Sequence, residues 1–320
     1  MISDIVAIAI PAYDEADRIG RCLDSLAAQD DPGPIVAVVV ANNCSDATAA
    51  IARAPRAIQV HVIEHAFADH ERGAGAARRM AMAQAAQLGT IVLTTDADCV
   101  ADRDWVRAHR AAFAGGADAV AGRVSADWSE LSLHPAPALR IGELEWTYLG
   151  LIAEAEPLFD PLVHDPAPRH AQRCGANLGI TRAMLERVGG VPALATGEDR
   201  ALLSAVELAD GRIRHDRAPH VTASARLVGR AGGGMADALR LRLAADYLCD
   251  DQLAPADALV AMWRARHAAR ATWRADATDR STFGAAWAAT VRKSHIAPRL
   301  RPADLPAEID RLRDWIASNA

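Results

Sequence analysis

The chain has 320 residues, 51% of them hydrophobic, and a formal net charge of −6 at pH 7. Such a chain can bury a sizeable core, which excludes an intrinsically disordered protein and leaves room for one large α/β domain with an appendage or for two domains. Nucleic-acid binding is not expected as its main activity, because no excess of basic side chains is present to neutralise phosphates.

The first part of the chain alternates short apolar runs with helical patterns. Residues 5–10 and 35–40 are continuous apolar runs, which predict buried strands, and a third strand over 58–63 follows at the spacing expected of repeated β-α units. Asp14 precedes the first helical pattern, and Ser45 or Asp46 precedes the second, so that each can cap a helix. This alternation predicts a parallel sheet with right-handed crossovers.

A helix to about Leu88 follows a polar stretch, and it opens with small residues at Gly73 and Gly75. The stretch is not a dinucleotide-binding loop, because that fingerprint places its glycines directly at a strand end. Small residues at a helix start allow a ligand or another element to approach closely. Arg78 in this helix can reach a phosphate, whereas Arg79 is typical of a helix surface.

Two carboxylates separated by one small residue, Asp96 and Asp98, end an apolar, β-branched run that begins at Thr90. The run predicts a buried strand, and ligands of open α/β sheets bind just beyond the carboxyl ends of strands. Carboxylates this close repel each other unless a cation lies beside them, and divalent ions combine one or two carboxylates with substrate phosphates. The pair therefore indicates a metal–diphosphate site. The alternative is a strand end followed by a helix cap, since aspartate favours both.

The region 128–172 breaks the alternation after a further predicted strand over 118–124. It contains an amphipathic segment over 139–152 and a loop rich in proline, histidine and aspartate over 157–170. Long insertions of this kind often form substrate walls. Their candidates for acceptor contact are His164, Asp165, Arg169 and His170.

The last part of the chain returns to a strand pattern over 173–180. Glu198 and Asp199 then begin a helix, where they either suit the helix dipole or supply a general base. Residues 213–215 and 220–223 predict a short strand pair, and glycines at 232–234 open a helix to Leu248. Helical patterns with four tryptophans dominate from about 255 onward, and helix packing is their simplest explanation.

The five cysteines are scattered and form no C-x-x-C pair, which suits free thiols in a reducing compartment. The N-terminus has no basic region typical of a signal peptide, and no apolar run approaches the ~18–20 residues that span a bilayer. We therefore expect a cytoplasmic protein without a transmembrane segment, with peripheral contact at the inner face of the membrane left open.

Taken in order, these motifs resemble the family 2 glycosyltransferases, which have the GT-A fold. The resemblance covers about residues 5–250, and its order and spacing are more specific than any one motif. The motifs are Pro11 to Glu15, Asn42 to Asp46, Gly73 to Arg78, Asp96 to Asp98, Gly175 to Asn177, Gly189-Gly190 and Glu198-Asp199.

This resemblance implies an α/β fold: a Rossmann-like, mostly parallel central sheet with helices on both faces, plus a helical C-terminal extension. We expect a GT-A domain over 1–250, with a nucleotide-binding half over 1–125 and an acceptor-binding, catalytic half over 126–250. The extension would cover 251–320.

The resemblance also assigns a donor site. It puts Pro11, Ala12, Tyr13 and Glu15 near the base and ribose. Asn42 stands where the family usually has an aspartate that contacts the base, which leaves the identity of the base open. Arg78 matches a position near the nucleotide or its phosphates. Asp98 matches the direct metal ligand, whereas Asp96, next to Ala97, matches a contact to ribose or to metal-bound water.

The remaining assignments concern the acceptor side. Asp199 matches the family's base, with Glu198 beside it. His220, with His215 behind it, is the candidate for a further metal ligand. Candidate acceptor contacts are His170, Asn177 and Arg226, and the arginines of 226–230 are also candidates for phosphate contact.

We therefore expect a metal-dependent, inverting transferase that moves a sugar from a nucleotide-diphosphate sugar to a hydroxyl acceptor, with Mg²⁺ or Mn²⁺ as cofactor. The acceptor, whether a small molecule, a glycan or a lipid-linked hydroxyl, is left open, as is the oligomeric state. The alternatives are a sugar-phosphate nucleotidyltransferase and a catalytically inactive, GT-A-like nucleotide-binding or scaffold protein.

Overall fold

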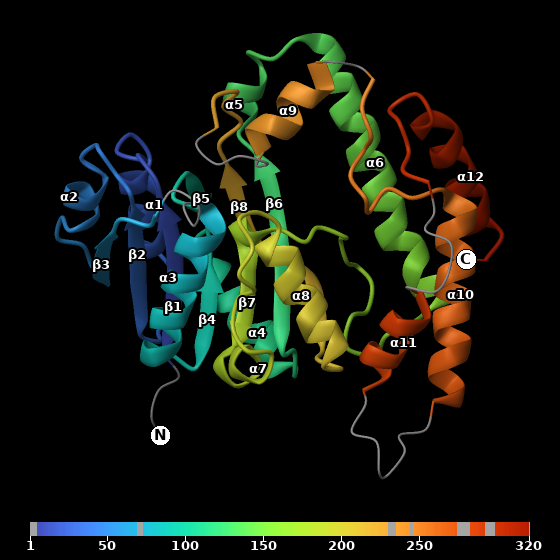
Figure 1. The fold of residues 1–320 in the computed structure, drawn as a ribbon, viewed down its shortest axis with the longest axis horizontal. Coiled ribbons are helices and arrows are strands. Elements are labelled where there is room, and N and C mark those ends of the chain that lie inside the picture. The colour runs from blue at the N-terminus through green and yellow to red at the C-terminus, as the bar shows by residue number, and fades with distance from the viewer. Residues whose placement is uncertain are drawn as a thin grey trace.

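A computed structural model describes residues 5–68, 73–229, 235–243, 246–273, 282–291 and 298–319. Its centre is an eight-stranded sheet with the strand order β3-β2-β1-β4-β7-β6-β8-β5 (Figure 1). In chain order the strands are β1 (Val6–Ala12), β2 (Ile35–Asn42), β3 (Gln59–His65), β4 (Ile91–Thr94), β5 (Cys99–Ala101), β6 (Ala119–Ala126), β7 (Leu178–Thr181) and β8 (Ile213–Ala223).

Strands β3, β2, β1 and β4 are mutually parallel, as the alternation predicted. The sheet becomes mixed beyond β4, because β7 runs antiparallel to both β4 and β6, whereas β8 is parallel to β6. Every residue of β1 is buried, which explains its continuous apolar run. The carboxyl ends of β1, β2 and β4 therefore lie along one edge of the sheet, and the predicted donor residues follow them.

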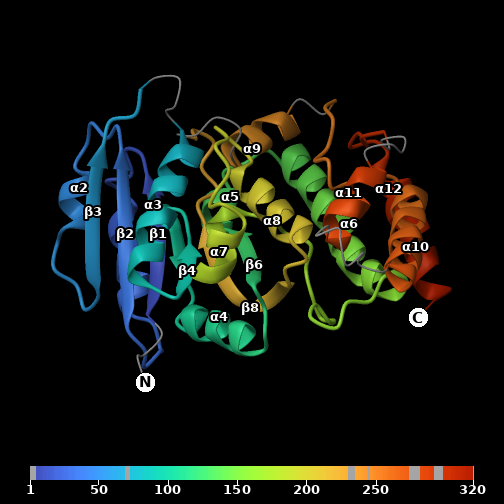
Figure 2. The ribbon, with the colours of Figure 1, turned by 60° about the horizontal axis from the view of Figure 1, so that its bottom comes forward.

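Helices cover both faces of this sheet (Figure 2). One core packs α3 (Ala74–Leu88), α7 (Arg182–Arg187) and α8 (Glu198–Leu208) against one face. A second core packs α1 (Ile19–Ala27), α2 (Thr48–Ala52) and α4 (Trp105–Ala114) against the other. The α/β fold with helices on both faces is confirmed.

A third core lies beside the sheet and consists of helices and the loops next to them, without a strand (Figure 1). It joins α6 (Ala136–Phe159) to α10 (Ala256–Thr272) and α12 (Leu305–Ala317), through Tyr148, Phe159 and Trp263 among others. The helical C-terminal extension is thus confirmed. Smaller helices are α5 (Trp128–Leu131), α9 (Met235–Leu243) and α11 (Phe283–Val291). Across the described ranges, no helix has both the length and the apolar character needed to span a membrane.

Two predicted elements differ from the structure. The strand pair over 213–215 and 220–223 is one strand, β8, whose pairing with β6 shifts register between Gly122 and Arg123. The polar residues between the two apolar runs indicated a turn, but this irregularity lets a single strand continue through them. The helix predicted from 232 to 248 is shorter in the structure: α9 covers Met235–Leu243, residues 246–248 are not helical, and the glycines at 232–234 lie outside the described residues.

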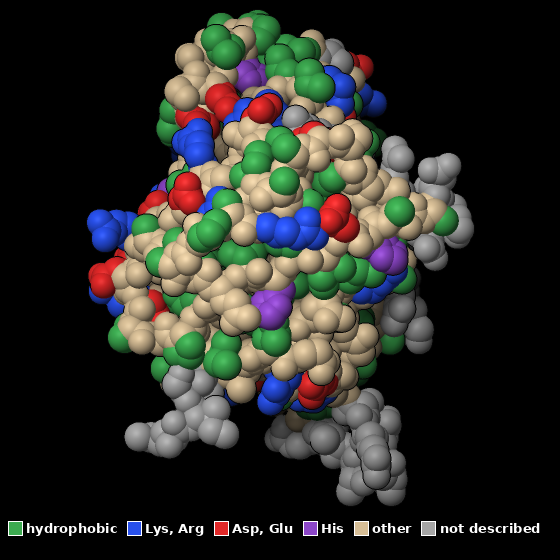
Figure 3. All heavy atoms as spheres, turned by 90° about the vertical axis from the view of Figure 1, so that its left-hand side faces the viewer, with side chains coloured by type: hydrophobic (Ala, Val, Ile, Leu, Met, Phe, Trp, Pro, Cys, Tyr) green, Lys and Arg blue, Asp and Glu red, His purple; other side chains and the backbone are tan. Residues whose placement is uncertain are grey.

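The face over β3, α2 and α3 shows acidic and basic side chains next to one another (Figure 3). On α2 and β3, the exposed Arg53 and Glu64 form an ion pair of 2.6 Å. Such exposed pairs contribute little to stability, and the features that matter for function lie at the carboxyl edge of the sheet.

Candidate donor and catalytic site

Asp96, Ala97 and Asp98 form the turn that connects β4 to β5, directly beyond the buried end of β4 at Thr94. The α3 helix brings Arg78 to this turn, and the start of α8 brings Glu198. The structure therefore assembles the Asp-x-Asp turn, the glycine-opened helix and the acidic pair into one cluster.

Arg78 holds this cluster together. Its side chain is buried, and it donates to Glu198 Oε1, Thr94 Oγ1, the Gly175 carbonyl and Asp96 Oδ1 at 2.8–2.9 Å. Burial alone would lower the pKa of Arg78, but the carboxylates of Asp96 and Glu198 outweigh it and hold the pKa above its ordinary value. These bonds use four of the five N–H groups of a guanidinium, so Arg78 joins protein groups rather than reaching out to a phosphate as predicted.

The two carboxylates at the start of α8 have different surroundings. Glu198 is 4% exposed and its carboxylate pairs with Arg78, so it is not open to a substrate as the predicted place in catalysis requires. Asp199 is partly exposed; its Oδ2 accepts from the Gly175 N–H at 2.6 Å and its Oδ1 from the Arg200 N–H at 2.7 Å. Of the pair, only Asp199 is accessible to a substrate while being held in one orientation.

Gly175 and Gly75 have no room for a side chain, because other protein groups, rather than a ligand, lie close to them. A Cβ on Gly175 would lie 2.6 Å from Cζ of Arg78, and one on Gly75 would lie 2.1 Å from the Leu194 carbonyl oxygen. Their lack of a side chain lets Arg78 and the segment before α8 close against the sheet edge. The predicted close approach is therefore made by other elements.

Asp98 lies on the other side of the turn, next to an arginine from the far end of β8. Arg226 Nη2 lies 3.1 Å from Asp98 Oδ2, and the same guanidinium binds both oxygens of the buried Glu15. Burial and the neighbouring Asp96 carboxylate raise the pKa of Asp98 to about 7, although Arg226 opposes the shift. Arg226 was predicted to contact the acceptor, but its side chain instead contacts Asp98 of the Asp-x-Asp turn.

The residues of this turn suit a hard divalent cation. Ligand atoms of Asp96, Asp98 and Cys99 all lie within 4.8 Å of one another, and two carboxylates are what Mg²⁺ or Mn²⁺ binds beside phosphates. The Cys99 side chain packs into the core beneath the turn, where burial raises the pKa of its thiol well above the ordinary value. The carboxylates, rather than the thiol, are therefore the candidate ligands.

His220 is not part of this cluster, and its prediction as a metal ligand is wrong. Its two ring nitrogens bind Ser125 Oγ at 2.8 Å and Asp102 Oδ2 at 2.9 Å. The Asp102 N–H donates to the His220 carbonyl, which places the residue at the far end of β5 from Asp98. His215 is further away in the fold, paired with the buried Asp165 at 2.8 Å.

Asn177 and His170 were predicted to contact the acceptor, and the structure contradicts both. Asn177 is 0% exposed, and its amide makes four hydrogen bonds, which are all it can make. Both ring nitrogens of His170 bind backbone groups of Asp216 and Gln172, and its burial lowers its pKa to about 4. Both side chains hold the strands and the 157–170 loop in place.

The predicted nucleotide loops lie at the ends of β1 and β2. Pro11 and Ala12 pair with Val40 and Ala41, so their side chains are buried and Tyr13 is the first partly exposed residue beyond them. Asn42 is 3% exposed; its Nδ2 donates to the Gly73 carbonyl at 3.2 Å, and its buried Oδ1 has no hydrogen-bond partner within the described chain. An unpaired buried acceptor is costly, which makes this oxygen a candidate for a ligand N–H.

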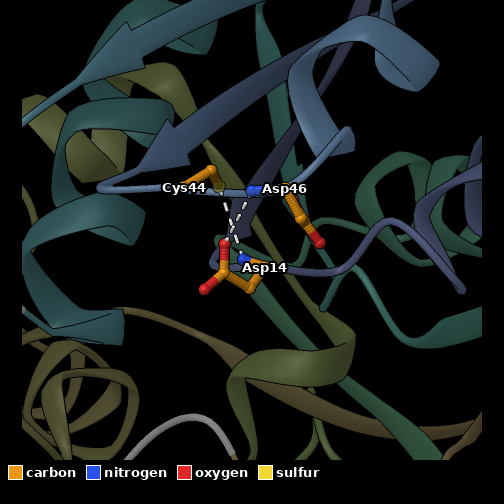
Figure 4. A group of neighbouring side chains, drawn as sticks. All are labelled: Asp14, Cys44 and Asp46. Carbon is orange, nitrogen blue, oxygen red and sulfur yellow. Dashed lines mark hydrogen bonds between the residues drawn. The ribbon is translucent and has the colours of Figure 1, made fainter.

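A second group of possible ligands, Asp14, Cys44 and Asp46, ties these two loops together (Figure 4). Asp14 Oδ1 accepts from the N–H groups of Ser45 at 2.7 Å and Asp46 at 3.3 Å, and the Asp14 N–H donates to Cys44 Sγ at 3.4 Å. Asp46 in turn accepts from the Ala16 N–H at 3.0 Å. Backbone donors occupy oxygens of both carboxylates, so the group fixes the two loops relative to each other.

Glu130 was missed by the sequence analysis. Its Oε1 accepts from Arg18 at 2.7 Å, and its Oε2 accepts from Ser224 Oγ at 2.6 Å and the Ala225 N–H at 2.8 Å. The residue thus fixes the backbone immediately before Arg226. No local signal could identify it, because its partners lie 94 or more residues away in the chain.

A mixed Rossmann-like sheet with an Asp-x-Asp turn at its carboxyl edge, plus C-terminal helices, is the GT-A class of fold. The family model "Glycosyl transferase family 2" matches residues 7–168, about half of the chain. The chain belongs to this family.

Two solved structures share the fold. The chain is 17% identical to Staphylococcus aureus TarS 1–349 in complex with UDP, with a TM-score of 0.51, over 83% of this chain and 71% of that one. It is 18% identical to the mannosyltransferase PcManGT from Pyrobaculum calidifontis in complex with GDP-Man and Mn²⁺, with a TM-score of 0.52, over 99% of this chain and 74% of that one.

One curated relative is similar in sequence. Glycosyltransferase AglE from Haloferax volcanii is 32% identical over 121 residues, which are 37% of this chain. The matched region spans 39% of the length of that relative.

Proposed function

We propose that this protein transfers a sugar from a nucleotide-diphosphate sugar to a hydroxyl acceptor, with inversion at the anomeric carbon and with a divalent cation at Asp98 and Asp96. The proposal rests on the hydrogen bonds of Arg78 with Asp96 and with the Gly175 carbonyl, and on the hydrogen bond from the Gly175 N–H to Asp199. They connect the Asp-x-Asp turn to Asp199, the accessible carboxylate at the start of α8.

On the donor side, Asn42 is the proposed contact to the base. Its unpaired Oδ1 can accept an N–H from a pyrimidine or a purine, and Nδ2 keeps the amide oriented through Gly73. Tyr13 and Glu15, in the loop after β1, complete the donor side of the proposed site. The TarS structure contains UDP and the PcManGT structure contains GDP-Man, so both bases are to be tested.

At the Asp-x-Asp turn, Asp98 and Asp96 would hold Mg²⁺ or Mn²⁺, which as a Lewis acid offsets the negative charge that develops on the leaving diphosphate. Arg78 keeps the Asp96 carboxylate in place through its 2.8 Å ion pair. The raised pKa of Asp98, about 7, follows from burial beside Asp96, and carboxylates in such surroundings favour a nearby cation.

On the acceptor side, Asp199 would take the proton of the attacking hydroxyl. The Gly175 and Arg200 N–H groups fix its two oxygens and thereby orient the carboxylate. A positioned base of this kind typically contributes about 10²–10⁴-fold to the rate. Attack on the face opposite the diphosphate inverts the configuration.

The test is sugar transfer measured with UDP- and GDP-sugars and a panel of small-molecule, glycan and lipid-linked hydroxyl acceptors. We expect Asp199→Asn to lower kcat by about 10²–10⁴-fold while nucleotide binding is retained. Glu207→Gln is the matched control, because Glu207 lies on the same helix and its exposed carboxylate pairs with Arg173. Equal activity of Asp199→Asn and the control would remove Asp199 from the mechanism.

The same assay separates the two rival functions. Release of pyrophosphate from a nucleoside triphosphate would identify a sugar-phosphate nucleotidyltransferase. Metal-dependent binding of a nucleotide sugar without turnover on any acceptor would instead favour an inactive binding protein.

A further inference from the structure

Arg226 is a partly buried cationic bridge between two carboxylates that follow different strands of the sheet. Its guanidinium binds both oxygens of Glu15, after β1, and lies 3.1 Å from Asp98, after β4. The Glu15 side chain is 7% exposed and that of Asp98 19% exposed, so both carboxylates have little water around them. Their charges therefore depend on a nearby cation.

The backbone immediately before Arg226 is held by side chains of another segment. Glu130 accepts from Ser224 Oγ and from the Ala225 N–H, and His134 Nε2 lies 2.7 Å from the Ala225 carbonyl. Beyond this point, within the residues that the structure describes, the Arg226 N–H makes one long contact, 3.3 Å, to Ser224 Oγ. The guanidinium of Arg226 can thus change partners without a change in the strand that precedes it.

We propose, on the basis of the function proposed above, that Arg226 is a displaceable cation. Its guanidinium holds Glu15 and Asp98 together until the metal–diphosphate arrives, and it then leaves Asp98 and binds the diphosphate. Arginine is suited to both partners, because its planar fork binds carboxylates and phosphates equally well. The metal alone must compete with Arg226 for Asp98, whereas the metal with a diphosphate offers the displaced guanidinium a new anionic partner.

This exchange has a measurable signature, since Arg226 opposes binding of the bare metal and favours binding of the diphosphate. In Mn²⁺ titrations followed by electron paramagnetic resonance without nucleotide, we expect Arg226→Ala to bind Mn²⁺ about tenfold more tightly than the wild type. In calorimetric titrations at saturating Mn²⁺, we expect the same variant to bind the preferred one of UDP and GDP about tenfold more weakly.

Arg226→Lys distinguishes two ways in which Arg226 could weaken metal binding: by occupying the carboxylate oxygens directly, or only by the electrostatic field of its positive charge. Lysine keeps the positive charge but lacks the fork that spans Glu15 and Asp98. If Arg226 occupies the ligand oxygens, Arg226→Lys also binds Mn²⁺ alone more tightly than the wild type. If only the field matters, Arg226→Lys and the wild type have the same Mn²⁺ affinity, and the proposal is overturned.

Arg53→Ala is the control, because Arg53 forms an exposed pair with Glu64 on the opposite part of the sheet. It should match the wild type in both titrations. Unchanged or weaker Mn²⁺ binding by Arg226→Ala, undiminished diphosphate binding by it, or an equal effect of Arg53→Ala contradicts the role of Arg226. A wild-type protein that binds neither diphosphate in the presence of Mn²⁺ contradicts the proposed function itself.

Discussion

Arg78 is the residue on which the arrangement of the site depends most. Its side chain is 6% exposed and lies between the carboxylates of Asp96 and Glu198, each at 2.8 Å. Because the guanidinium compensates two carboxylates, it sets the spacing between the Asp-x-Asp turn and the start of α8. It also connects to Asp199 through Gly175, whose carbonyl accepts from Arg78 and whose N–H donates to Asp199.

Replacing Arg78 by glutamine should therefore be costly. We expect Arg78→Gln to lower the free energy of unfolding by about 3–5 kcal/mol, because it leaves the buried Glu198 carboxylate without its cation. The measurement is urea denaturation of the variant and of Arg107→Gln, whose ion pair with Asp30 is exposed on both sides. The control should lose less than about 1 kcal/mol; similar losses for the two variants would show that the Arg78 network is not structural.

His109 gives a prediction about pH. It is 0% exposed, and burial lowers its pKa to about 4, against an ordinary value of 6.5. The unfolded chain thus binds a proton that the folded chain does not, so stability is complete above pH 6.5 and falls as the pH drops from 6.5 to 4. The loss from this residue is at most roughly 3 kcal/mol.

We expect His109→Gln to reduce this decline in acid, measured as the change in Tm between pH 7 and pH 4.5. His170, whose pKa is also lowered to about 4, contributes a decline of the same sign in both proteins, so the difference between them isolates His109. The exposed His65→Gln serves as control and should follow the wild type. A variant as acid-sensitive as the wild type would contradict the assignment.

For individual residues, the sequence correctly predicted the members of the cluster whose positions are set by their neighbours in the sequence. Asp96 and Asp98 end a buried strand, and Glu198 and Asp199 begin a helix, so their positions follow from local pattern. The predicted roles of His220 as a metal ligand and of Asn177 and Arg226 as acceptor contacts do not match the contacts that these side chains make, because their partners are distant in the chain. The contacts are His220 with Ser125, Asn177 with Trp105, and Arg226 with Glu15, which are separated by 95, 72 and 211 residues.

At the scale of elements, the start of α3 controls how closely the segment before α8 approaches the sheet. Gly75 has no room for a side chain, because a Cβ would lie 2.1 Å from the Leu194 carbonyl and 3.2 Å from Glu198 Oε2. The close contact between Gly75 and the Leu194 carbonyl therefore helps to hold Glu198, and with it the neighbouring Asp199, at the site.

We expect Gly75→Ala to lower the free energy of unfolding by about 1–3 kcal/mol and to reduce kcat, because the segment carrying Glu198 must move outward. Gly150→Ala is the matched control: Gly150 lies within α6 and has nothing within 4 Å of the added Cβ. It should instead stabilise the protein by roughly 0.5–1 kcal/mol, since alanine favours a helix interior. Unchanged stability and kcat in Gly75→Ala would contradict the proposed contact.

The parallel strands β1, β2 and β4 could be predicted because each is a short, almost fully buried apolar run, whereas the edge strand β3 is only partly buried and was predicted from its place in the alternation. The strand β8 could not, because its polar middle resembles a turn and its continuity depends on the irregular pairing with β6. Similarly, the sequence indicated an amphipathic segment over 139–152, whereas α6 extends from Ala136 to Phe159 and includes Pro157. The ends of that helix are set by packing against α10 and α12, which no local pattern reports.

At the scale of the whole molecule, α6 shares a core with the C-terminal helices. Tyr148, Ile152 and Phe159 of α6 pack with Trp263 and Leu312, and none of these side chains belongs to the two cores of the sheet. Buried Asp160, at the end of α6, also forms ion pairs with Arg266 and Arg270 of α10. We therefore propose that the helical unit begins at α6, rather than at the boundary at 250 expected from the sequence.

A chain truncated after Asp250 tests this boundary. We expect the 1–250 fragment to be unstable or aggregated, because it exposes the apolar face of α6 that α10 and α12 cover. Circular dichroism and gel filtration, with the full chain as control, measure this. A monomeric fragment with the Tm of the full chain would support the boundary at 250 instead.

The central claim is that Asp98 supports metal-dependent binding of a nucleoside diphosphate. The measurement that tests it most directly is calorimetric titration of UDP, GDP and their sugar conjugates, with and without Mn²⁺, into the wild type and Asp98→Asn. We predict that the wild type binds the conjugates of one base only when Mn²⁺ is present, and that Asp98→Asn loses this binding while keeping the wild-type fold. Binding that is independent of Mn²⁺, or equal in the two proteins, would contradict the account.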